Sequence, residues 1–192
     1  MTDTTVTSRT VDGVEYPAVG TYAIDTSHTR LGFAVRHMAV SKVRGDFKEF
    51  AGTLELAENP VDSKISVTIQ AGSVDTHDEN RDNHLRTNDF FDAENHPTWT
   101  FTSTAIRPVT STEWNVDGDL TIRGVTKQVT LDATLEGVVK DPYGFHRVGF
   151  SAKTTIERED FGVSFNGVME AGGVVVGKKV DIDLEIEATY QA

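Results

Sequence analysis

The strongest constraint on this chain is a strict alternation of apolar and acidic residues near its C-terminal end. Over Val180–Ala188, an apolar residue occupies every second position and an aspartate or glutamate stands at each position between them. Because successive side chains of a β-strand point to opposite faces, this pattern predicts a strand with one dry face and one wet face. The row of acids is therefore interpreted as a solvated surface and not as a metal site.

The same two-residue period recurs along the chain from Tyr22 onward. The alternating segments are 30–36, 65–69, 114–122, 129–135 and 148–156, with shorter strands expected at 43–56, 98–107 and 161–165. Asp141–Gly144, Arg123–Lys127 and Asn166–Gly167 have the composition of turns between strands. Gly118 is interpreted as a bend within a strand, because the alternation runs through it.

One segment departs from the strand pattern. Asp75–Asp78 offers N-cap residues, and Glu79–Asn88 runs without glycine or proline, which predicts one short polar helix. Residues 1–20 are weakly patterned and are expected to form an extended or frayed arm, which leaves 21–192 as one domain. About eight to ten strands, one helix and no strand–helix alternation predict an antiparallel barrel or sandwich. An eight-stranded barrel can be filled by its own side chains or can hold one ligand.

Composition argues against several classes of function. The 18 basic and 30 acidic residues give a net charge of −12, which repels nucleic acid and anionic membrane surfaces. The absence of cysteine excludes disulfides, thiolate metal sites and cysteine nucleophiles. The sequence shows no signal peptide and no apolar run of about 18 residues. We therefore expect a cytoplasmic protein with no stable membrane insertion, no nucleic-acid partner and no cofactor.

Motifs for catalysis and metal binding are weak. The six histidines are scattered, and a metal site built from His77 and His84 is less favoured than polar contacts at one end of a barrel. His37 is in phase with the apolar residues before it, so it is expected to face inward, either as a satisfied histidine or as a contact to a ligand head group. Neither a Gly-x-Ser-x-Gly motif nor a phosphate-binding loop is present. No catalytic or metal-binding residue is assigned.

Aromatic residues are more plentiful than an ordinary small core requires. If they fill the barrel, the chain is an interaction module that should show an exposed apolar patch. If they line a cavity, the chain binds a ligand or is an enzyme acting on an apolar substrate. Periodicity does not separate these alternatives. The set comprises Phe33, Phe47, Phe50, Phe90, Phe91, Trp99, Phe101, Phe150, Phe161 and Phe165.

Six motifs, each weak alone, follow one another along the chain. In order they are Tyr22-Ala23-Ile24-Asp25-x-x-His28 with Phe33-x-Val35-Arg36-His37-Met38; Gly45-x-Phe47-x-x-Phe50-x-Gly52; Arg81-Asp82-Asn83-His84-Leu85-Arg86-x-x-x-Phe90-Phe91-Asp92; Pro97-x-Trp99-x-Phe101-x-Ser103; Gly118-x-Leu120-Thr121-Ile122-Arg123-Gly124-Val125-Thr126-Lys127; and Arg158-x-Asp160-Phe161-Gly162. Together they resemble the YceI-like family of lipid-binding proteins over about residues 21–189. Gln128 stands where that family usually has proline, a departure at a hairpin edge.

The resemblance implies an all-β fold, an extended eight-stranded antiparallel lipocalin-like barrel with one short α-helix. It also implies a hydrophobic channel for a polyisoprenoid or similar long-chain lipid of quinone or polyprenyl type, and a possible homodimer. Many relatives are exported, whereas this chain shows no export signal. Arg81 and His84 are expected either to contact the lipid head group or only to tether the helix to the barrel. The expected ligand-binding residues are Phe33, Val35, His37, Met38, Phe47, Arg81, His84, Phe90, Phe91, Trp99, Phe101, Phe150 and Phe161.

Overall fold

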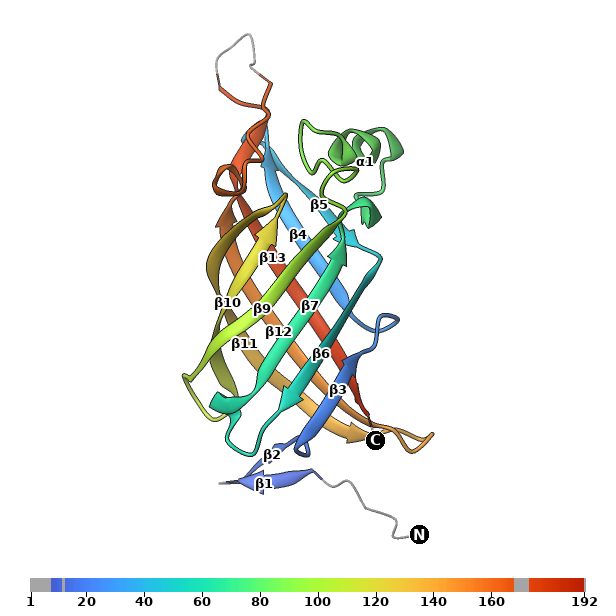
Figure 1. Cartoon of the computed structure of the whole chain (residues 1–192), viewed down its shortest axis with the longest axis vertical. Helices are drawn as coiled ribbons and strands as arrows, with labels where there is room; N and C mark the ends of the chain where they lie inside the picture. Colours follow the sequence, from blue (N-terminus) through green and yellow to red (C-terminus); the bar gives the residue numbers. More distant parts are fainter. Residues whose placement is uncertain (1–7, 12, 168–172, 192) are drawn as a thin grey trace.

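The alternating segments form the strands of a closed antiparallel β-barrel (Figure 1). The computed structural model describes residues 8–11, 13–167 and 173–191. Neighbouring strands pair around the ring in the order β3, β6, β7, β9, β10, β11, β12 and β13, and β13 pairs back to β3. The expected eight-stranded barrel with one helix is confirmed. The ring strands are β3 (Gly20–Ile24), β6 (Phe50–Leu56), β7 (Lys64–Gln70), β9 (Thr98–Pro108), β10 (Glu113–Ile122), β11 (Val125–Lys140), β12 (His146–Glu157) and β13 (Val176–Tyr190).

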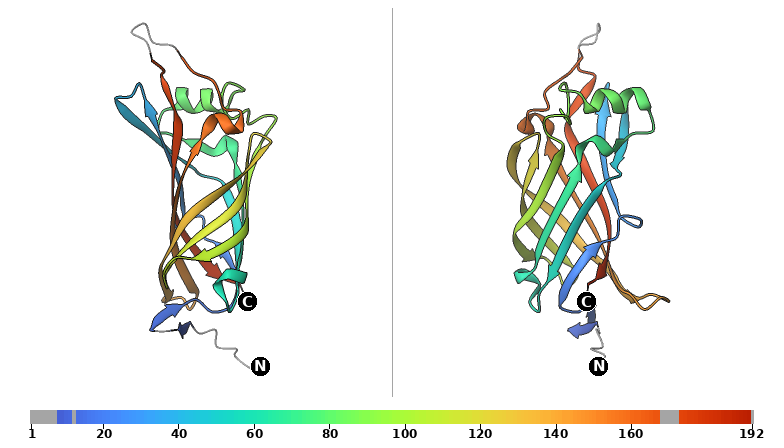
Figure 2. Two further views of the ribbon diagram at one scale, coloured as in Figure 1. Left: turned by 90° about the vertical axis from the view of Figure 1, so that its left-hand side faces the viewer. Right: turned by 45° about the vertical axis from the view of Figure 1, so that its right-hand side comes forward.

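Three further strands extend one end of the barrel wall. They are β4 (Arg30–His37), β5 (Ser41–Phe47) and β8 (Val74–Asp75). β13 pairs with β3 only at Ala188–Tyr190 and with β4 along most of its remaining length. β3 and β4 therefore occupy the same strand position in the barrel wall, one after the other. β5 pairs with β4 and β8. Among the described residues no ladder joins β8 to β9, and the chain between these strands carries α1 (Glu79–Arg86) at this end of the barrel (Figure 2).

The helix begins and ends close to the predicted positions. Asp78 is its N-cap, and its carboxylate accepts a hydrogen bond from the backbone N–H of Arg81 at 3.0 Å, which satisfies one free donor of the first turn. Asp82 is buried and accepts from the backbone N–H of Thr76 at 2.9 Å. Arg86 donates to the carbonyl of Val74 at 3.0 Å. These contacts fix a helix too polar to be held by an apolar face of its own.

Turn chemistry explains the connections between the long strands. Arg123 and Gly124 both have positive φ, 51° and 74°, as a two-residue hairpin between β10 and β11 requires. Asp141 opens the β11–β12 turn by accepting hydrogen bonds from the backbone N–H groups of Tyr143 and Phe145, both at 2.9 Å. Gly118 does lie within β10, beside a register shift with β9. A Cβ there would stand 2.3 Å from the Phe101 ring, so only glycine admits that aromatic side chain.

Two local expectations are wrong. Residues 161–165 form no strand, because η3 (Arg158–Phe161) ends there and an irregular segment follows. Asn166 does not make a hairpin turn, since its side-chain amide pairs with the backbone of Val176. The shorter strands expected in 43–56 are present as β5 and β6, which Lys48 and Glu49 separate. In the N-terminal arm, which was expected to be extended or frayed, β1 (Arg9–Val11) and β2 (Val14–Tyr16) are extended and pair as a hairpin.

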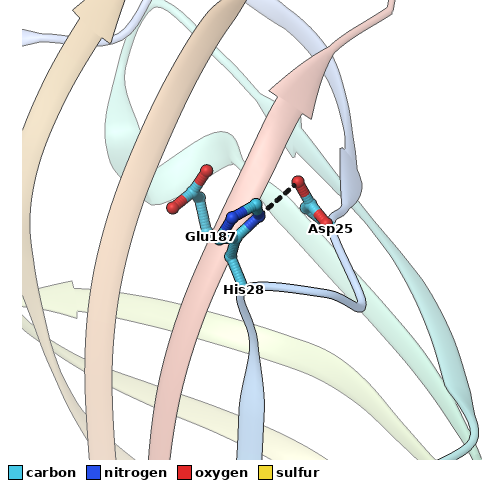
Figure 3. A group of neighbouring side chains, drawn as sticks. All are labelled: Asp25, His28 and Glu187. Atoms are coloured by element: carbon cyan, nitrogen blue, oxygen red, sulfur yellow. Dashed lines mark hydrogen bonds and ion pairs between the residues drawn. The ribbon is translucent and has the colours of Figure 1, made fainter. Parts of the chain in front are cut away.

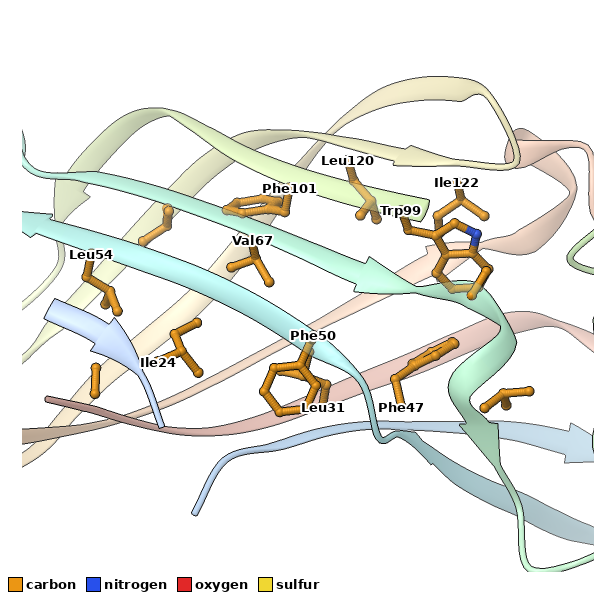
Figure 4. Close-up of a cluster of buried hydrophobic side chains, with 14 of the residues drawn as sticks. Ile24, Leu31, Phe47, Phe50, Leu54, Val67, Trp99, Phe101, Leu120 and Ile122 are labelled. Atoms are coloured by element: carbon orange, nitrogen blue, oxygen red, sulfur yellow. The ribbon is translucent and has the colours of Figure 1, made fainter. Parts of the chain in front are cut away.

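The hydrophobic core is the inside of the barrel (Figure 4). The side chain of Tyr22 is part of this core and is only 1% exposed. Its hydroxyl donates a hydrogen bond to the carbonyl of Ala18 at 3.0 Å. Burial, together with the neighbouring Tyr190, raises the pKa of Tyr22 to about 12. No helix in the described parts of the chain is long and apolar enough to cross a lipid bilayer. The two short 3-10 turns not yet named are η1 (Pro60–Asp62) and η2 (Ala71–Ser73).

Candidate functional site

The barrel encloses an elongated cavity of about 270 Å³. Its walls are the inward faces of the alternating strands, so the sequence pattern itself makes them apolar. On β10 the lining runs from Trp114 to Ile122, a span of about 26 Å along the strand at ~3.3 Å per residue. Among the described lining residues, only Arg9, Tyr16 and Arg158 carry ionisable side chains. The cavity can therefore solvate a long apolar molecule and offers such a molecule few polar contacts.

An aromatic cluster lines the channel at the end that carries α1. The Trp99 ring lies 4.9 Å from Phe47 and 4.7 Å from Phe91, centroid to centroid, both in edge-to-face geometry. Phe33 packs against Phe47 at 5.7 Å. Phe91 is held in this cluster because its backbone N–H donates to the Leu85 carbonyl at the end of the helix. The segment after the helix thus supplies part of the channel wall where the strand ladder is missing.

The hairpin of β1 and β2 lies across the opposite end of the channel (Figure 1). Tyr16 lines the cavity, packs edge-on against Trp114 with centroids 6.3 Å apart, and donates its hydroxyl to the carbonyl of Ser111. Arg9 lines the cavity too, stacks over the Tyr16 ring at 5.7 Å and donates from Nη2 to the carbonyl of Ala57 at 3.0 Å. The hairpin is therefore a lid built from two amphipathic side chains.

Two nitrogen donors of the channel wall are unsatisfied. The Nε of Arg9 and the Nε1 of Trp99 are both sealed from solvent and have no hydrogen-bond partner among the described residues. A buried donor without a partner costs about 1–3 kcal/mol. The two donors stand toward opposite ends of the channel, so an acceptor atom on an enclosed molecule could satisfy either one.

The structure divides the predicted ligand-binding residues into two groups. Four of them, His37, Met38, Arg81 and His84, are not part of the cavity lining. The others line the cavity, and they are Phe33, Val35, Phe47, Phe90, Phe91, Trp99, Phe101, Phe150 and Phe161. Phe165, from the wider aromatic set, is 38% exposed and also lies outside the lining.

Arg81 and His84 have partners within their own segment. Arg81 donates to both the hydroxyl and the carbonyl of Thr76, at 2.7 and 2.8 Å. His84 pairs with Asp89 at 2.8 Å and packs edge-on against Phe90. These contacts favour the tethering role for both residues. His77 interacts with Asp75, so the helix histidines do not converge on a common metal position.

Arg158 is, like Arg9 and Tyr16, a polar channel-lining residue that sequence reasoning did not single out as functional. It is 5% exposed, and its guanidinium donates to the carbonyls of Val163, Phe165, Val176 and Gly177 at 2.6 to 3.3 Å. Burial lowers the pKa of this guanidinium from its usual value. Arg158 thereby fixes the start of β13 to the segment after η3. Only tertiary structure reveals this role, because all four partners are backbone atoms.

A polar cluster on the barrel wall brings together Asp25, His28 and Glu187, with potential ligand atoms within 4.8 Å of one another (Figure 3). The cluster already contains a cation: Arg147 Nη1 donates to Asp25 and to Glu187, each at 2.6 Å, and its Nε donates to Asp141 at 2.7 Å. A hydrogen bond from Ser27, followed by that from Arg147, holds the pKa of Asp25 well below its usual range. The group is therefore an ion-pair network centred on Arg147, and no metal site is assigned to it.

Comparison with known sequences identifies one family. Residues 22–188 match the YceI-like domain. The protein YceI of Escherichia coli O157:H7 is 39% identical over 173 residues, which cover 88% of this chain and 87% of the relative. A UPF0312 protein of Staphylococcus epidermidis is 40% identical over 168 residues, 86% of this chain and 95% of the relative.

Solved structures share the architecture. BcnA from Burkholderia cenocepacia superposes with a TM-score of 0.76 at 26% identity, over 86% of this chain and 99% of that one. The Campylobacter jejuni YCEI protein gives 0.68 at 31% identity, over 88% and 96%. A polyisoprenoid binding domain from Saccharophagus degradans, implicated in plant cell wall breakdown, gives 0.69 over 88% and 98%. At 16% identity this last likeness concerns the fold alone.

Proposed function

This chain belongs to the YceI-like family, and from that premise we propose that its channel binds one long apolar lipid of polyisoprenoid or comparable type. The lipid is carried, stored or sequestered and is not chemically changed. The observation that carries the proposal is the elongated cavity with an almost wholly apolar wall. The polyisoprenoid binding domain that shares this fold supports the choice of ligand class.

The energetics suit this ligand class. Each buried methylene contributes about 0.8 kcal/mol, so one five-carbon isoprene unit contributes about 4 kcal/mol before ordering costs. A few units therefore bind without any strong polar contact. Selectivity between apolar tails is expected to be weak, because the wall presents few directional groups. An oxygen-bearing lipid binds more tightly than a pure hydrocarbon where its oxygen accepts a hydrogen bond from the unpaired donor of Arg9 or of Trp99.

The alternative, an enzyme acting on an apolar substrate in the cavity, lacks support from the channel wall. Such an enzyme needs an inward carboxylate or imidazole with a shifted pKa. No aspartate, glutamate or histidine belongs to the described cavity lining. His84, one candidate general base, is engaged by Asp89 outside the cavity. An interaction module with a filled barrel is less favoured as well, because the interior holds a cavity.

The test is to extract the natively purified protein with organic solvent and to identify bound lipid by mass spectrometry. Ala152→Phe should block the channel, since Ala152 lines it; the matched control is Ala51→Phe on the exposed face of β6. We expect a stoichiometric long-chain lipid in the wild type and the control, and little in the Ala152 variant. Repeated absence of lipid from the wild type, together with no uptake of a polyprenol by the delipidated protein, would overturn the proposal.

A further inference from the structure

The hairpin between β4 and β5 exposes apolar side chains beside the channel. Its tip, defined here as Met38, Ala39 and Val40, projects from the barrel at the end that carries α1 (Figure 2, left). Val40 is 84% exposed and Met38 is 41% exposed. The hairpin adjoins the channel because Val35 lines the cavity.

The backbone of the hairpin tip is strained. Met38 and Ala39 have positive φ, 51° and 58°, a region that favours glycine and asparagine and is costly for other residues. The turn is closed by a hydrogen bond from Val40 N–H to the His37 carbonyl at 3.0 Å, and Met38 N–H donates to Val175 at 2.8 Å. Asn-Gly would relax this turn. The chain instead has an exposed methionine at this position. The methionine strains the backbone and contributes little packing to the fold.

Cations surround the hairpin tip in a chain that is acidic elsewhere. No aspartate or glutamate occurs from Thr26 through Gly45, although the chain has 30 acids. Arg36 and Lys42 stand directly opposite each other in the β4–β5 ladder, a like-charge pairing that destabilises a sheet. Lys42 has one acidic partner, Asp181 at 2.6 Å. Arg44 adds a third cation on the same face as Arg36 and Lys42.

Long-range repulsion by the net charge does not cancel this local charge. The Debye length is about 8 Å at physiological salt, so a surface that approaches the hairpin tip responds mainly to the nearest charges. Lys178 and Lys179, near the start of β13, lie beside the hairpin because Val176 pairs with His37, but Lys178 is paired with Glu159 at 2.9 Å and Lys179 stands opposite Glu157. The exposed apolar residues of the tip, next to Arg36, Lys42 and Arg44, match an anionic lipid surface.

We propose that the hairpin tip docks this protein on anionic lipid bilayers, so that lipid enters and leaves the channel at the α1 end. The inference rests on the proposed lipid-binding function and adds a site to it. Met38 and Val40 enter the interface while Arg36, Lys42 and Arg44 contact lipid phosphates. The strain and the like-charge pair, which weaken the free protein, are offset on the membrane.

The test is flotation of the protein with vesicles of phosphatidylcholine alone and with vesicles of equal parts phosphatidylcholine and phosphatidylglycerol. Wild type should bind the anionic vesicles, and high salt should weaken that binding. Arg36→Gln and Arg44→Gln should each reduce binding about fivefold. Met38→Asn with Ala39→Gly should reduce binding while leaving the melting temperature unchanged or higher, because it removes both the apolar contact and the strain.

Val40→Asp has a matched control in Tyr143→Asp. Tyr143 is 86% exposed at the tip of the β11–β12 turn, and we expect its replacement to leave vesicle binding unchanged. The docking proposal is overturned if the wild type does not bind anionic vesicles. It is also overturned if Tyr143→Asp and Val40→Asp lower vesicle binding equally. Loading of a polyprenol from detergent tests the channel separately: docking variants should still load it, whereas failure of wild type to load counts against the proposed function.

Discussion

At the residue scale, the channel wall contains very few polar side chains. Almost every lining side chain can be exchanged for another apolar one of similar volume at small cost. Trp99 differs, because its indole N–H is sealed within the wall without a partner among the described residues. It sits among Phe47 and Phe91, and its packing is fixed by those rings. The Trp99 N–H is therefore one of the two positions, with the Nε of Arg9, at which an oxygen-bearing ligand can gain a directional contact.

Trp99→Phe tests this role. Its affinity for a polyprenol should fall about two- to tenfold, the equivalent of one net hydrogen bond of ~0.5–1.5 kcal/mol. Its affinity for a hydrocarbon of equal length should fall clearly less. Titration of the delipidated protein with both ligands measures the difference. Trp114→Phe serves as the control for loss of an indole in packing, and equal losses for both ligands in the Trp99 variant would contradict the assignment.

At the element scale, the hairpin of β1 and β2 changes the channel from a tube into a pocket with one closed end. It lies outside the residues that match the family, 22–188. Its inner face carries Arg9 and Tyr16, and its outer face exposes Thr10 and Glu15. The two faces follow from strand alternation, as in the barrel itself.

Replacing Arg9 and Tyr16 together by alanine should open a second exit, opposite the one at the α1 end, and speed release of bound lipid by roughly tenfold, because contacts worth ~1–2 kcal/mol close that end. Stopped-flow transfer of a fluorescent polyene lipid to vesicles measures the rate. Thr10→Ala with Glu15→Ala, on the other face of the same hairpin, should leave release unchanged. If both double variants release lipid at the wild-type rate, the hairpin does not control exit.

At the scale of the whole molecule, Arg147 joins parts of the chain that lie far apart in sequence. It connects Asp25 after β3, Asp141 in the β11–β12 turn and Glu187 on β13. The pKa of Asp25 is held below the ordinary range by the hydrogen bond from Ser27 and then by that from Arg147, and the pKa of Asp141 is lowered chiefly by the hydrogen bond from Arg147. A carboxyl whose pKa is lower in the folded state binds fewer protons there than in the unfolded chain, so stability rises with pH through that region.

The network should therefore stabilise the barrel at neutral pH and lose that effect as pH falls below about 5, through the ordinary carboxyl pKa near 3.9 and beyond it. Arg147→Gln should lower the melting temperature at pH 7 and lower it less at pH 3. Calorimetry across that range measures the difference. Lys140→Gln removes the same charge next to the same turn and should show little change at either pH. A pH-independent difference for Arg147→Gln would contradict this account.

The sequence pattern by itself determined an antiparallel fold that is either a barrel or a sandwich, and the family resemblance selected the eight-stranded barrel. The alternation in β13 and in the other long strands requires one dry face per strand, and only a closed or packed sheet can bury so many of them. The hairpin at Arg123–Gly124 and the helix after Asp78 were predictable for the same reason, since their chemistry is local. The strand expected at 161–165 was wrong because the carbonyls of Val163 and Phe165 accept hydrogen bonds from the buried Arg158 guanidinium and do not pair with a neighbouring strand.

Only the tertiary structure decided what the barrel contains and what its ends do. Periodicity places Phe47, Trp99 and Phe150 on inward faces, but it does not say whether inward side chains meet or leave a cavity, because that depends on strand tilt and stagger. The closed end built by Arg9 and the exposed tip at Val40 are likewise invisible in the pattern. The closed end arises where the β1–β2 hairpin meets Ala57 and Ser111, which are far away in the chain. The hairpin at Val40 is local, but its exposure depends on where the rest of the barrel ends.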